Sequence, residues 1–201
     1  MLERPAHGDA LLIVDVQNDF LPGGALAVPG GDEVIGAINR AIRLFEASGL
    51  PVFATRDWHP ADHCSFREQG GPWPPHCVQN SRGAELAARL ELPRSAVLVS
   101  KATSPERDAY SGFDGTNLEE RLRAAGARRL YVGGLATDYC VLATVRHAIE
   151  RGFRVHLLVD AVRAVDARPG DGERAIEQMD RLGAVLTEVG GEDVQPPAPA
   201  P

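Results

Sequence analysis

The chain has 201 residues, of which 44% are hydrophobic, so it can bury the core of one ordinary globular domain. Its net charge of −7, with no basic cluster beyond Arg128 and Arg129, argues against a nucleic-acid partner. Three cysteines without framework spacing fit a reducing cytosol, so we expect a cytoplasmic protein. The longest apolar runs, such as Ala10–Val14, are too short to cross a membrane, and residues 1–9 lack the pattern of a signal peptide.

Short apolar runs alternate with amphipathic stretches along the chain. The apolar runs predict buried strands at 10–16, 51–57, 95–100, 129–133, 153–160 and 184–187. The amphipathic stretches predict helices at 32–48, 84–90, 117–125, 138–151 and 171–182. We expect N-caps at Asp32 and at Thr137 or Asp138, and a capping box formed by Asn117 and Glu120.

This alternation, without a repeat or an internal linker, predicts an α/β fold with a mainly parallel sheet. The expected architecture is three-layered, α/β/α and Rossmann-like, with six strands in the sheet. One domain should occupy residues 1–190, and the Pro/Ala-rich residues 191–201 should form a disordered tail.

Chemically active residues stand where three of the predicted strands end. Asp15 closes the first strand, Lys101 follows the third, and Cys140 lies in the first turn of the helix after the fourth. Ligands collect at the carboxyl ends of parallel strands, so these three residues can converge. Each also has a plain structural reading: Asp15 as a turn cap, Lys101 as a side chain reaching solvent, and Cys140 as a small buried hydrophobe.

The functional reading is nucleophilic catalysis by the thiol. At a helix N-terminus the dipole and the unpaired N–H groups are expected to lower the pKa of Cys140. A neighbouring Lys101 would stabilise the thiolate, and Asp15 could take the thiol proton and later hand it to a leaving amine.

The stretch 57–77 is rich in proline, glycine and histidine, which predicts a long ordered loop with a function. Asp57 and His59, two residues apart, share one face of an extended segment, and two prolines deliver His76. One oxygen and two nitrogens suit Zn²⁺, Fe²⁺ or Mn²⁺ with coordination positions left open. His63 is a candidate further ligand or a supporting group.

Two other readings of this loop remain open. A closed structural zinc site could use Cys64 or Cys77, although neither stands in a Cys-x-x-Cys pair. The histidines could also be ordinary solvated loop residues.

Several motifs resemble those of the nicotinamidase/pyrazinamidase family, within the isochorismatase-like cysteine hydrolase superfamily. The resemblance runs from about residue 10 to residue 189, and it is carried by Asp15-Val-Gln-Asn-Asp-Phe20, Asp57-Trp-His-Pro60, Trp73-Pro-Pro-His-Cys77, Ser100-Lys101, Tyr110-Ser-Gly-Phe113 and Gly134-Leu-Ala-Thr-Asp-Tyr-Cys140.

The resemblance implies a role for each candidate residue. Cys140 would be the nucleophile, Asp15 the general acid/base, and Lys101 the residue that holds both in their charged forms. The implied metal ligands are Asp57, His59 and His76, with zinc the first choice and manganese or iron as alternatives.

The resemblance also implies the substrate-binding residues, which are Phe20, Trp73, Tyr110, Leu135 and Ala136. The Leu135–Ala136 bond matches a non-proline cis peptide. It would direct the backbone N–H of Ala136, together with that of Cys140, at a developing oxyanion.

The implied activity is the conversion of nicotinamide to nicotinate and ammonia through a thioester, a step of NAD salvage, with pyrazinamide as an analogue. The expected partner is this small substrate, with no nucleic acid and no membrane, and a homo-oligomer is an open expectation. Alternatives are isochorismatase or a carbamoyl or ureido amidohydrolase of the same superfamily, and a non-catalytic metal-binding domain. A dinucleotide oxidoreductase is disfavoured because Gly133-Gly134 lacks the Gly-x-Gly-x-x-Gly spacing.

Overall fold

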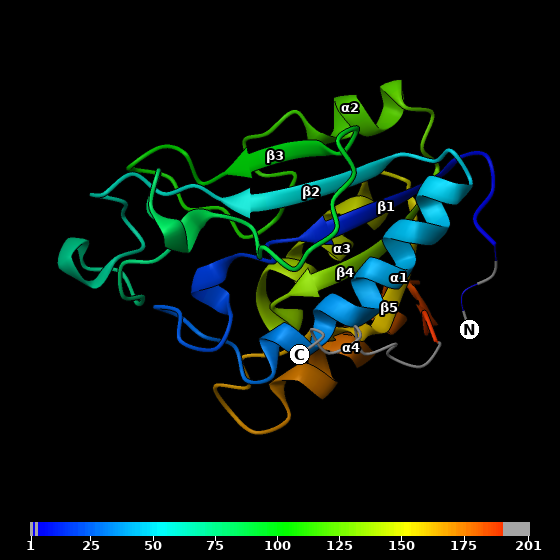
Figure 1. Ribbon diagram of the computed structural model, residues 1–201. Helices are drawn as coiled ribbons and strands as arrows, with labels where there is room; N and C mark the ends of the chain where they lie inside the picture. The colour runs from blue at the N-terminus through cyan, green and yellow to red at the C-terminus, as the bar shows by residue number, and fades with distance from the viewer. Residues whose placement is uncertain (1, 3, 191–201) are drawn as a thin grey trace, which may run out of the picture.

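A computed structural model describes residues 2 and 4–190 of the chain, and these form an α/β fold around one parallel sheet (Figure 1). The strands are β1 (Asp9–Val14), β2 (Val52–Asp57), β3 (Val97–Lys101), β4 (Arg129–Leu135), β5 (Arg154–Arg163) and β6 (Val185–Thr187). Their order is β3-β2-β1-β4-β5-β6, and every neighbouring pair is parallel. The predicted fold class is confirmed.

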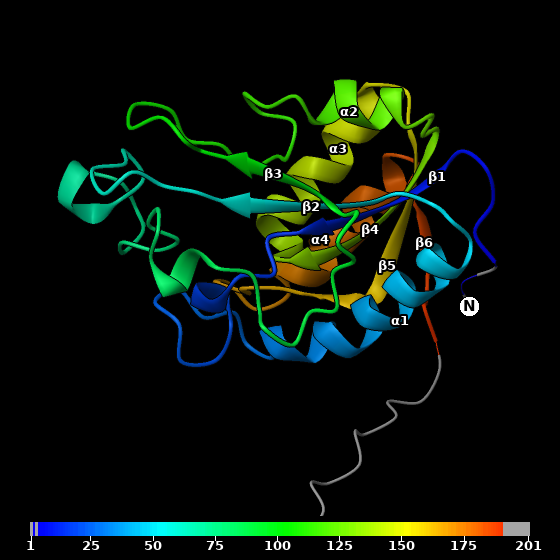
Figure 2. The ribbon, with the colours of Figure 1, turned by 45° about the horizontal axis from the view of Figure 1, so that its top comes forward.

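Helices cover both faces of this sheet. They are α1 (Val34–Ala47), α2 (Leu118–Ala124), α3 (Leu142–Glu150) and α4 (Asp171–Arg181). Figures 1 and 2 show α1 on one face and the other three helices on the opposite face. The strand β1 is buried throughout because Leu11 and Ile13 pack on the α1 side while Leu12 and Val14 pack on the other. A strand buried on both faces reads as the continuous apolar run seen in the sequence.

The direction of strand addition reverses between β1 and β4. The chain builds outward from β1 through β2 to β3, and then returns to the other side of β1 with β4, β5 and β6. Such a switch point leaves a crevice outside the carboxyl ends of the central strands. Asp15 directly follows β1, and Cys140 lies in the turn after β4, so both residues stand at this crevice.

The helix predicted for residues 84–90 is wrong. Its backbone groups bond to other segments: the N–H of Ala87 donates to the carbonyl oxygen of Val16 over 2.9 Å. The side-chain amide of Asn39, on α1, donates to the carbonyl oxygen of Arg89 over 2.9 Å. The apolar spacing of this segment therefore reflects packing against α1 in an irregular conformation, not a helical face.

Of the predicted N-caps, Asn117 occupies the N-cap position of α2, but its side chain makes no capping hydrogen bond, and the other predicted residues are not caps. Asp32 lies inside a 3-10 turn before α1, and Thr137 is the first residue of a π-helical turn. The side chain of Asn117 accepts a hydrogen bond from the side chain of Arg121 and not from the backbone of α2. Asp138 accepts backbone N–H groups from a distant loop.

The predicted division into a domain at 1–190 and a disordered tail stays a prediction, since residues 191–201 lie outside the described part of the chain. No helix among the described residues is long and apolar enough to cross a membrane.

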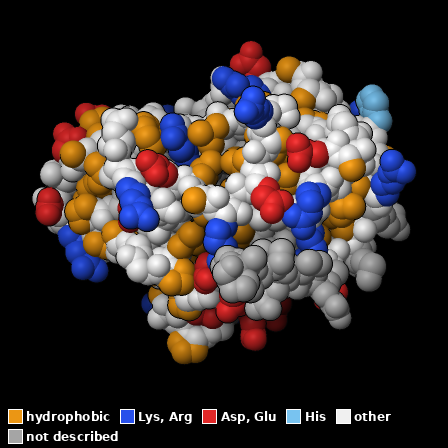
Figure 3. Space-filling model, viewed as in Figure 1, with side chains coloured by type: hydrophobic (Ala, Val, Ile, Leu, Met, Phe, Trp, Pro, Cys, Tyr) orange, Lys and Arg blue, Asp and Glu red, His pale blue; other side chains and the backbone are white. Residues whose placement is uncertain are grey.

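On the face seen in Figure 3, basic and acidic side chains are interspersed, as on an ordinary solvated surface.

Gly134 allows the backbones of β1 and β4 to approach closely, and a substitution there tests how tightly these strands pack. A Cβ at Gly134, where φ is +126°, would lie 2.0 Å from the carbonyl oxygen of Val14. We expect Gly134→Ala to lower the free energy of unfolding by at least about 3 kcal/mol, measured by urea unfolding, because strand backbone cannot move aside cheaply. The control Gly152→Ala also has positive φ, +81°, but open space around it. It should cost only about 1 kcal/mol, and an equal loss in both variants would contradict the expected clash.

Candidate active site

The predicted convergence of charged side chains occurs around Lys101, the last residue of β3. Its Nζ lies 3.0 Å from Asp15 Oδ2 and 3.5 Å from Cys140 Sγ. It also forms an ion pair with Asp57, which is its in-register neighbour on β2, and donates to the carbonyl oxygen of Ala109 over 3.1 Å. Lys101 is only 1% exposed, so these are its surroundings and not solvent. An ammonium ion thus holds together residues that follow or end three different strands.

Burial and charge set the protonation of this cluster. Burial alone would lower the pKa of Lys101, but Asp15 and Asp57 outweigh it and raise that pKa well above its usual value. Burial raises the pKa of Asp15, and Lys101 opposes this rise. Burial likewise raises the pKa of Cys140 well above the ordinary thiol value, although Lys101 opposes it. The expected lowering of the Cys140 pKa is therefore wrong, because burial of the thiol outweighs the nearby cation.

The carboxylate of Asp15 is held by one oxygen. Thr55 donates its hydroxyl to Oδ1 over 2.6 Å, while Oδ2 accepts no hydrogen bond of good geometry from the described residues. A carboxylate oxygen of Asp15 lies within 4.8 Å of the Cys140 sulfur. The backbone of Asp15 is left-handed, with φ of 49°. The side chain is thus anchored by Thr55 through one oxygen, while its other oxygen is paired with Lys101 and the carboxylate lies near the thiol.

Cys140 lies in a π-helical turn, Thr137–Val141, and not in the first turn of an α-helix as predicted. The N–H of Val141 bonds to the carbonyl oxygen of Ala136 over 3.1 Å, five residues back, and α3 begins only afterwards. The bond between Leu135 and Ala136 is cis, as the family resemblance implied. Single π turns inside helices often occur at functional sites.

The three predicted metal ligands also come together. One ligand atom from each of Asp57, His59 and His76 lies within 4.8 Å of the others, and all three residues are buried. The carbonyl oxygens beside the two rings fix the tautomers: Nδ1 of His59 donates to His76 over 3.0 Å, and Nδ1 of His76 donates to Pro74 over 2.8 Å. Both Nε2 atoms are then free to bind a cation. Burial lowers the pKa of His59 to about 3, so its ring is neutral, as a ligand must be. The donor set fits a divalent metal ion.

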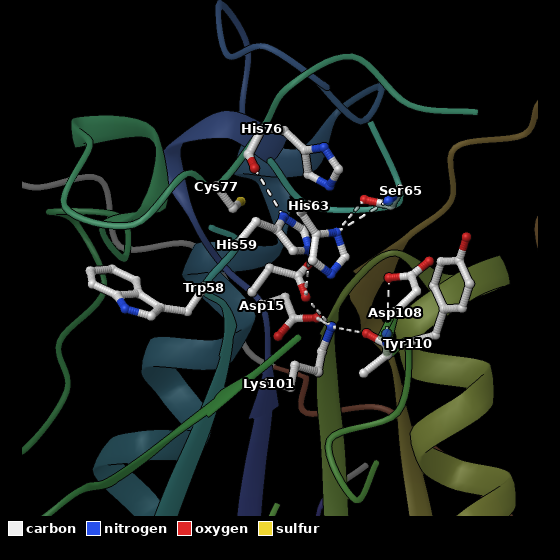
Figure 4. Close-up of polar contacts among 12 residues, drawn as sticks. Asp15, Trp58, His59, His63, Ser65, His76, Cys77, Lys101, Asp108 and Tyr110 are labelled. Carbon is white, nitrogen blue, oxygen red and sulfur yellow. Dashed lines mark hydrogen bonds and ion pairs between the residues drawn. The ribbon is translucent and has the colours of Figure 1, made fainter. Parts of the chain in front are cut away.

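His63 lies beside this set but bonds differently. Figure 4 shows His59, His63 and His76 grouped above Lys101 and Asp15. Ser65 donates its N–H to Nδ1 of His63 over 3.3 Å, and its hydroxyl lies 2.8 Å from the same nitrogen. The other nitrogen, Nε2, donates to a backbone carbonyl oxygen over 3.2 Å, so both ring nitrogens are engaged.

Another potential metal group would combine His59 and His63 with Asp108, which is exposed. No potential metal group among the described residues includes Cys64 or Cys77. Burial also raises the pKa of Cys77, which disfavours the thiolate that a closed zinc site needs.

A pocket of about 410 Å³, including its open mouth, leads to Cys140. Its aromatic walls are Phe20, Trp73, Tyr110 and Tyr139. Trp73 donates its indole N–H to the hydroxyl of Tyr110 over 3.0 Å, which fixes two of these rings relative to each other.

The remaining lining is aliphatic, from Leu26, Val28, Ala136 and Val165, and the polar floor is formed by Asp57, His76 and Cys140. Leu135, which we expected to contact a substrate, is not part of this lining, because its side chain is fully buried in the core on the α1 side. A largely apolar, aromatic lining with a few convergent polar groups suits a small aromatic molecule.

Two positioning residues were missed by sequence reasoning. The fully buried side chain of Gln17 accepts the backbone N–H of Asp57 over 2.7 Å and donates to the carbonyl oxygen of Asp57 over 2.8 Å. Asp19 accepts the N–H of Cys77, next to His76, over 2.7 Å. No periodicity marks either residue, and the only signal was their place in the motif that starts at Asp15. Sequence reasoning also missed Tyr139 as a wall of the pocket.

Known proteins share this architecture and these motifs. The family model of the isochorismatase domain matches residues 9–190. The nicotinamidase of Escherichia coli is 41% identical over 198 residues, which cover 88% of this chain and 93% of that protein. The crystal structure of the pyrazinamidase of Pyrococcus horikoshii in complex with zinc is 52% identical, with a TM-score of 0.87 over 90% of this chain and 99% of that one. The structure of PnC1 from L. infantum in complex with nicotinate is 40% identical, with a TM-score of 0.81 over 90% of this chain and 93% of that one. The chain therefore belongs to the isochorismatase family.

Proposed function

We propose that the chain is a nicotinamidase, which hydrolyses nicotinamide to nicotinate and ammonia through a covalent thioester. The observation that carries the proposal is the contact of one buried ammonium group, that of Lys101, with Asp15 and with Cys140, which lines an aromatic pocket. The names of the E. coli and P. horikoshii relatives support the substrate class. Pyrazinamide keeps a ring nitrogen in the same relation to the carboxamide, so we include it as a second substrate.

The first half of the reaction forms the thioester. Because the pKa of Cys140 is raised, its thiol is protonated at rest and needs a base. Asp15 takes the Sγ proton, and Lys101 stabilises the resulting thiolate by charge. The sulfur attacks the carboxamide carbon and forms a C–S bond. Asp15 then returns the proton to the amine nitrogen, the C–N bond breaks, and ammonia leaves.

The second half releases the acid. Water enters where ammonia left, Asp15 removes a proton from it, and the oxygen attacks the thioester carbon. The C–S bond breaks, Asp15 returns the proton to the sulfur of Cys140, and the acid loses its remaining proton to solvent and departs as nicotinate. In both halves the backbone N–H groups of Ala136 and Cys140 would stabilise the oxyanion, a contribution worth about 3 kcal/mol for one donor in other enzymes.

Asp57, His59 and His76 would hold a divalent metal ion, for which zinc suits the one-oxygen, two-nitrogen set and manganese or iron are the alternatives. When bound, the ion supplies a Lewis acid for the pyridine nitrogen of the substrate. The chain itself orients the ring, because Phe20 and Trp73 line the pocket beside His76. We assign His63 to the support of His59 and not to the metal, since both of its ring nitrogens have other partners. The three free cysteines are consistent with a reducing, cytoplasmic location.

The nucleophile gives the first test. We expect Cys140→Ala to reduce ammonia release from nicotinamide at least about 10⁴-fold, as loss of a catalytic nucleophile does elsewhere. Acid-quenched wild type should carry a nicotinoyl adduct by intact mass, and Cys140→Ala should not. Cys64→Ala is the matched control, because Cys64 is a free thiol outside the pocket, and it should keep wild-type activity. Equal ammonia release by wild type and Cys140→Ala would remove the proposed mechanism.

The metal set gives the second test, read by elemental analysis of purified protein. Wild type should hold about one equivalent of a divalent metal, and His59→Ala should lose it, because one of only three protein ligands is gone. His147→Ala is the control, since His147 pairs with Asp114 away from the pocket, and it should retain the metal. His63→Ala should retain it too. A metal-free wild type that is fully active, or loss of metal in all three variants, would contradict the assignment.

A further inference from the structure

The π turn points three consecutive side chains at three different parts of the molecule. Cys140 contacts Lys101 at the floor of the pocket. The ring of Tyr139 lies in the wall, with its centroid 5.3 Å from that of Trp73. Asp138 points away from both and binds the loop between β5 and α4. Nothing in the proposed reaction uses Asp138.

Each carboxylate oxygen of Asp138 accepts one backbone N–H group of this loop, and we call this pair of hydrogen bonds a clasp. Its Oδ1 accepts the N–H of Val165 over 2.9 Å, and its Oδ2 accepts the N–H of Asp166 over 3.0 Å. Hydrogen bonds to a carboxylate are roughly twice as strong as neutral ones, so this clasp is a firm attachment. The carboxylate of Asp166 in turn accepts the N–H of Gly172, in the first turn of α4, over 2.8 Å, which ties the same residue to that helix.

The clasped loop forms part of the substrate pocket. Val165 is one of the aliphatic lining residues, and Ala136 and Tyr139, on either side of the clasping residue, are lining residues as well. Asp138 therefore ties one wall of the pocket directly to the turn that carries the nucleophile. Two walls from segments far apart in the sequence are fixed at a set separation, and that separation limits the size of the ring that can enter.

We propose that Asp138 is a specificity-determining positioning residue, which fixes the Val165 wall and so restricts the pocket to small monocyclic aromatic amides. This inference rests on the proposed nicotinamidase function. Asp138 acts through the loop and does not touch the reacting atoms. Its loss should therefore weaken substrate binding and size selection more than it slows the chemical step.

Asp160 provides a matched control, because it makes the same kind of clasp away from the pocket. Its Oδ1 accepts the N–H of Val189 over 2.8 Å and its Oδ2 accepts the N–H of Gly190 over 3.0 Å. Asp138→Asn and Asp160→Asn each remove one negative charge and replace one acceptor oxygen by an NH₂ group, which donates. Their effects on unfolding should be similar, and only the first should alter the pocket.

The experiment compares kcat and KM for nicotinamide and for 5-methyl- and 5-phenylnicotinamide, which keep the ring nitrogen and the carboxamide. In Asp138→Asn, KM for nicotinamide should rise about tenfold, the effect of losing one charge-assisted hydrogen bond, with kcat within about threefold of wild type. The ratio of kcat/KM for 5-phenylnicotinamide to that for nicotinamide should rise at least about tenfold, a usual scale for steric discrimination. Asp160→Asn should leave both quantities within about twofold.

Val165→Ala keeps the test decisive if Asp138→Asn does not fold. It removes two methyl groups from the wall without touching the nucleophile turn, so it should raise the same ratio. If Val165→Ala, or a folded Asp138→Asn, matches Asp160→Asn in KM and in size preference, the inference is overturned while the nicotinamidase function stands. A fall in kcat of Asp138→Asn with unchanged KM and ratio also overturns it, because that pattern indicates damage to the turn alone. Wild type that releases no ammonia from nicotinamide overturns the proposed function itself.

Discussion

The site depends on one buried cation shared among three anionic or ionisable groups. Lys101 lies on an edge strand, and its long side chain reaches past Asp57 on β2 to Asp15 after β1. Taking these charges out of water is costly, and removing one partner of a buried ion pair commonly costs about 3–5 kcal/mol. The ion pairs form because the register of β2 and β3 puts Asp57 and Lys101 side by side. The register of the sheet therefore fixes the Asp57–Lys101 ion pair of this cluster.

Around this cluster, irregular segments are fixed by buried polar side chains and not by regular secondary structure. Gln17 pairs with the backbone of Asp57, Asp19 holds the segment after His76, and Asp138 holds the loop after β5. Buried backbone groups must be paired, and in long loops such side chains supply the missing partners. This explains how a segment rich in proline and glycine can hold two histidines with their Nε2 atoms free for a common ligand.

Sequence reasoning found the features that rest on simple periodicity. Strands buried on both faces read as apolar runs, and the carboxyl ends of parallel strands meet at one edge, so the meeting of Asp15, Lys101 and Cys140 could be predicted. It failed where tertiary contacts override local pattern. Residues 84–90 have helical spacing, yet their backbone bonds to α1 and to the loop after β1. The predicted cap at Asp138 failed in the same way, since its carboxylate accepts backbone N–H groups from a distant loop.

The electrostatics of the thiol could not be predicted from the sequence either. A helix N-terminus suggested a lowered pKa for Cys140, whereas burial of the thiol raises that pKa. Burial depends on how loops pack over the strand ends, and no local pattern encodes that. The same limit applies to Gln17 and Asp19, whose partners lie 40 and 58 residues away along the chain.

Asp57 belongs to two assemblies at once, as an ion-pair partner of Lys101 and as a member of the histidine set. The two roles make different demands on evolution. Even without the two histidines, a negative charge at position 57 would be needed to balance the buried ammonium group of Lys101. A neutral residue at position 57 would remove both the ion pair with Lys101 and the negative charge of the histidine set. Position 57 should therefore tolerate fewer substitutions than position 59, because the residue at position 57 must remain negatively charged.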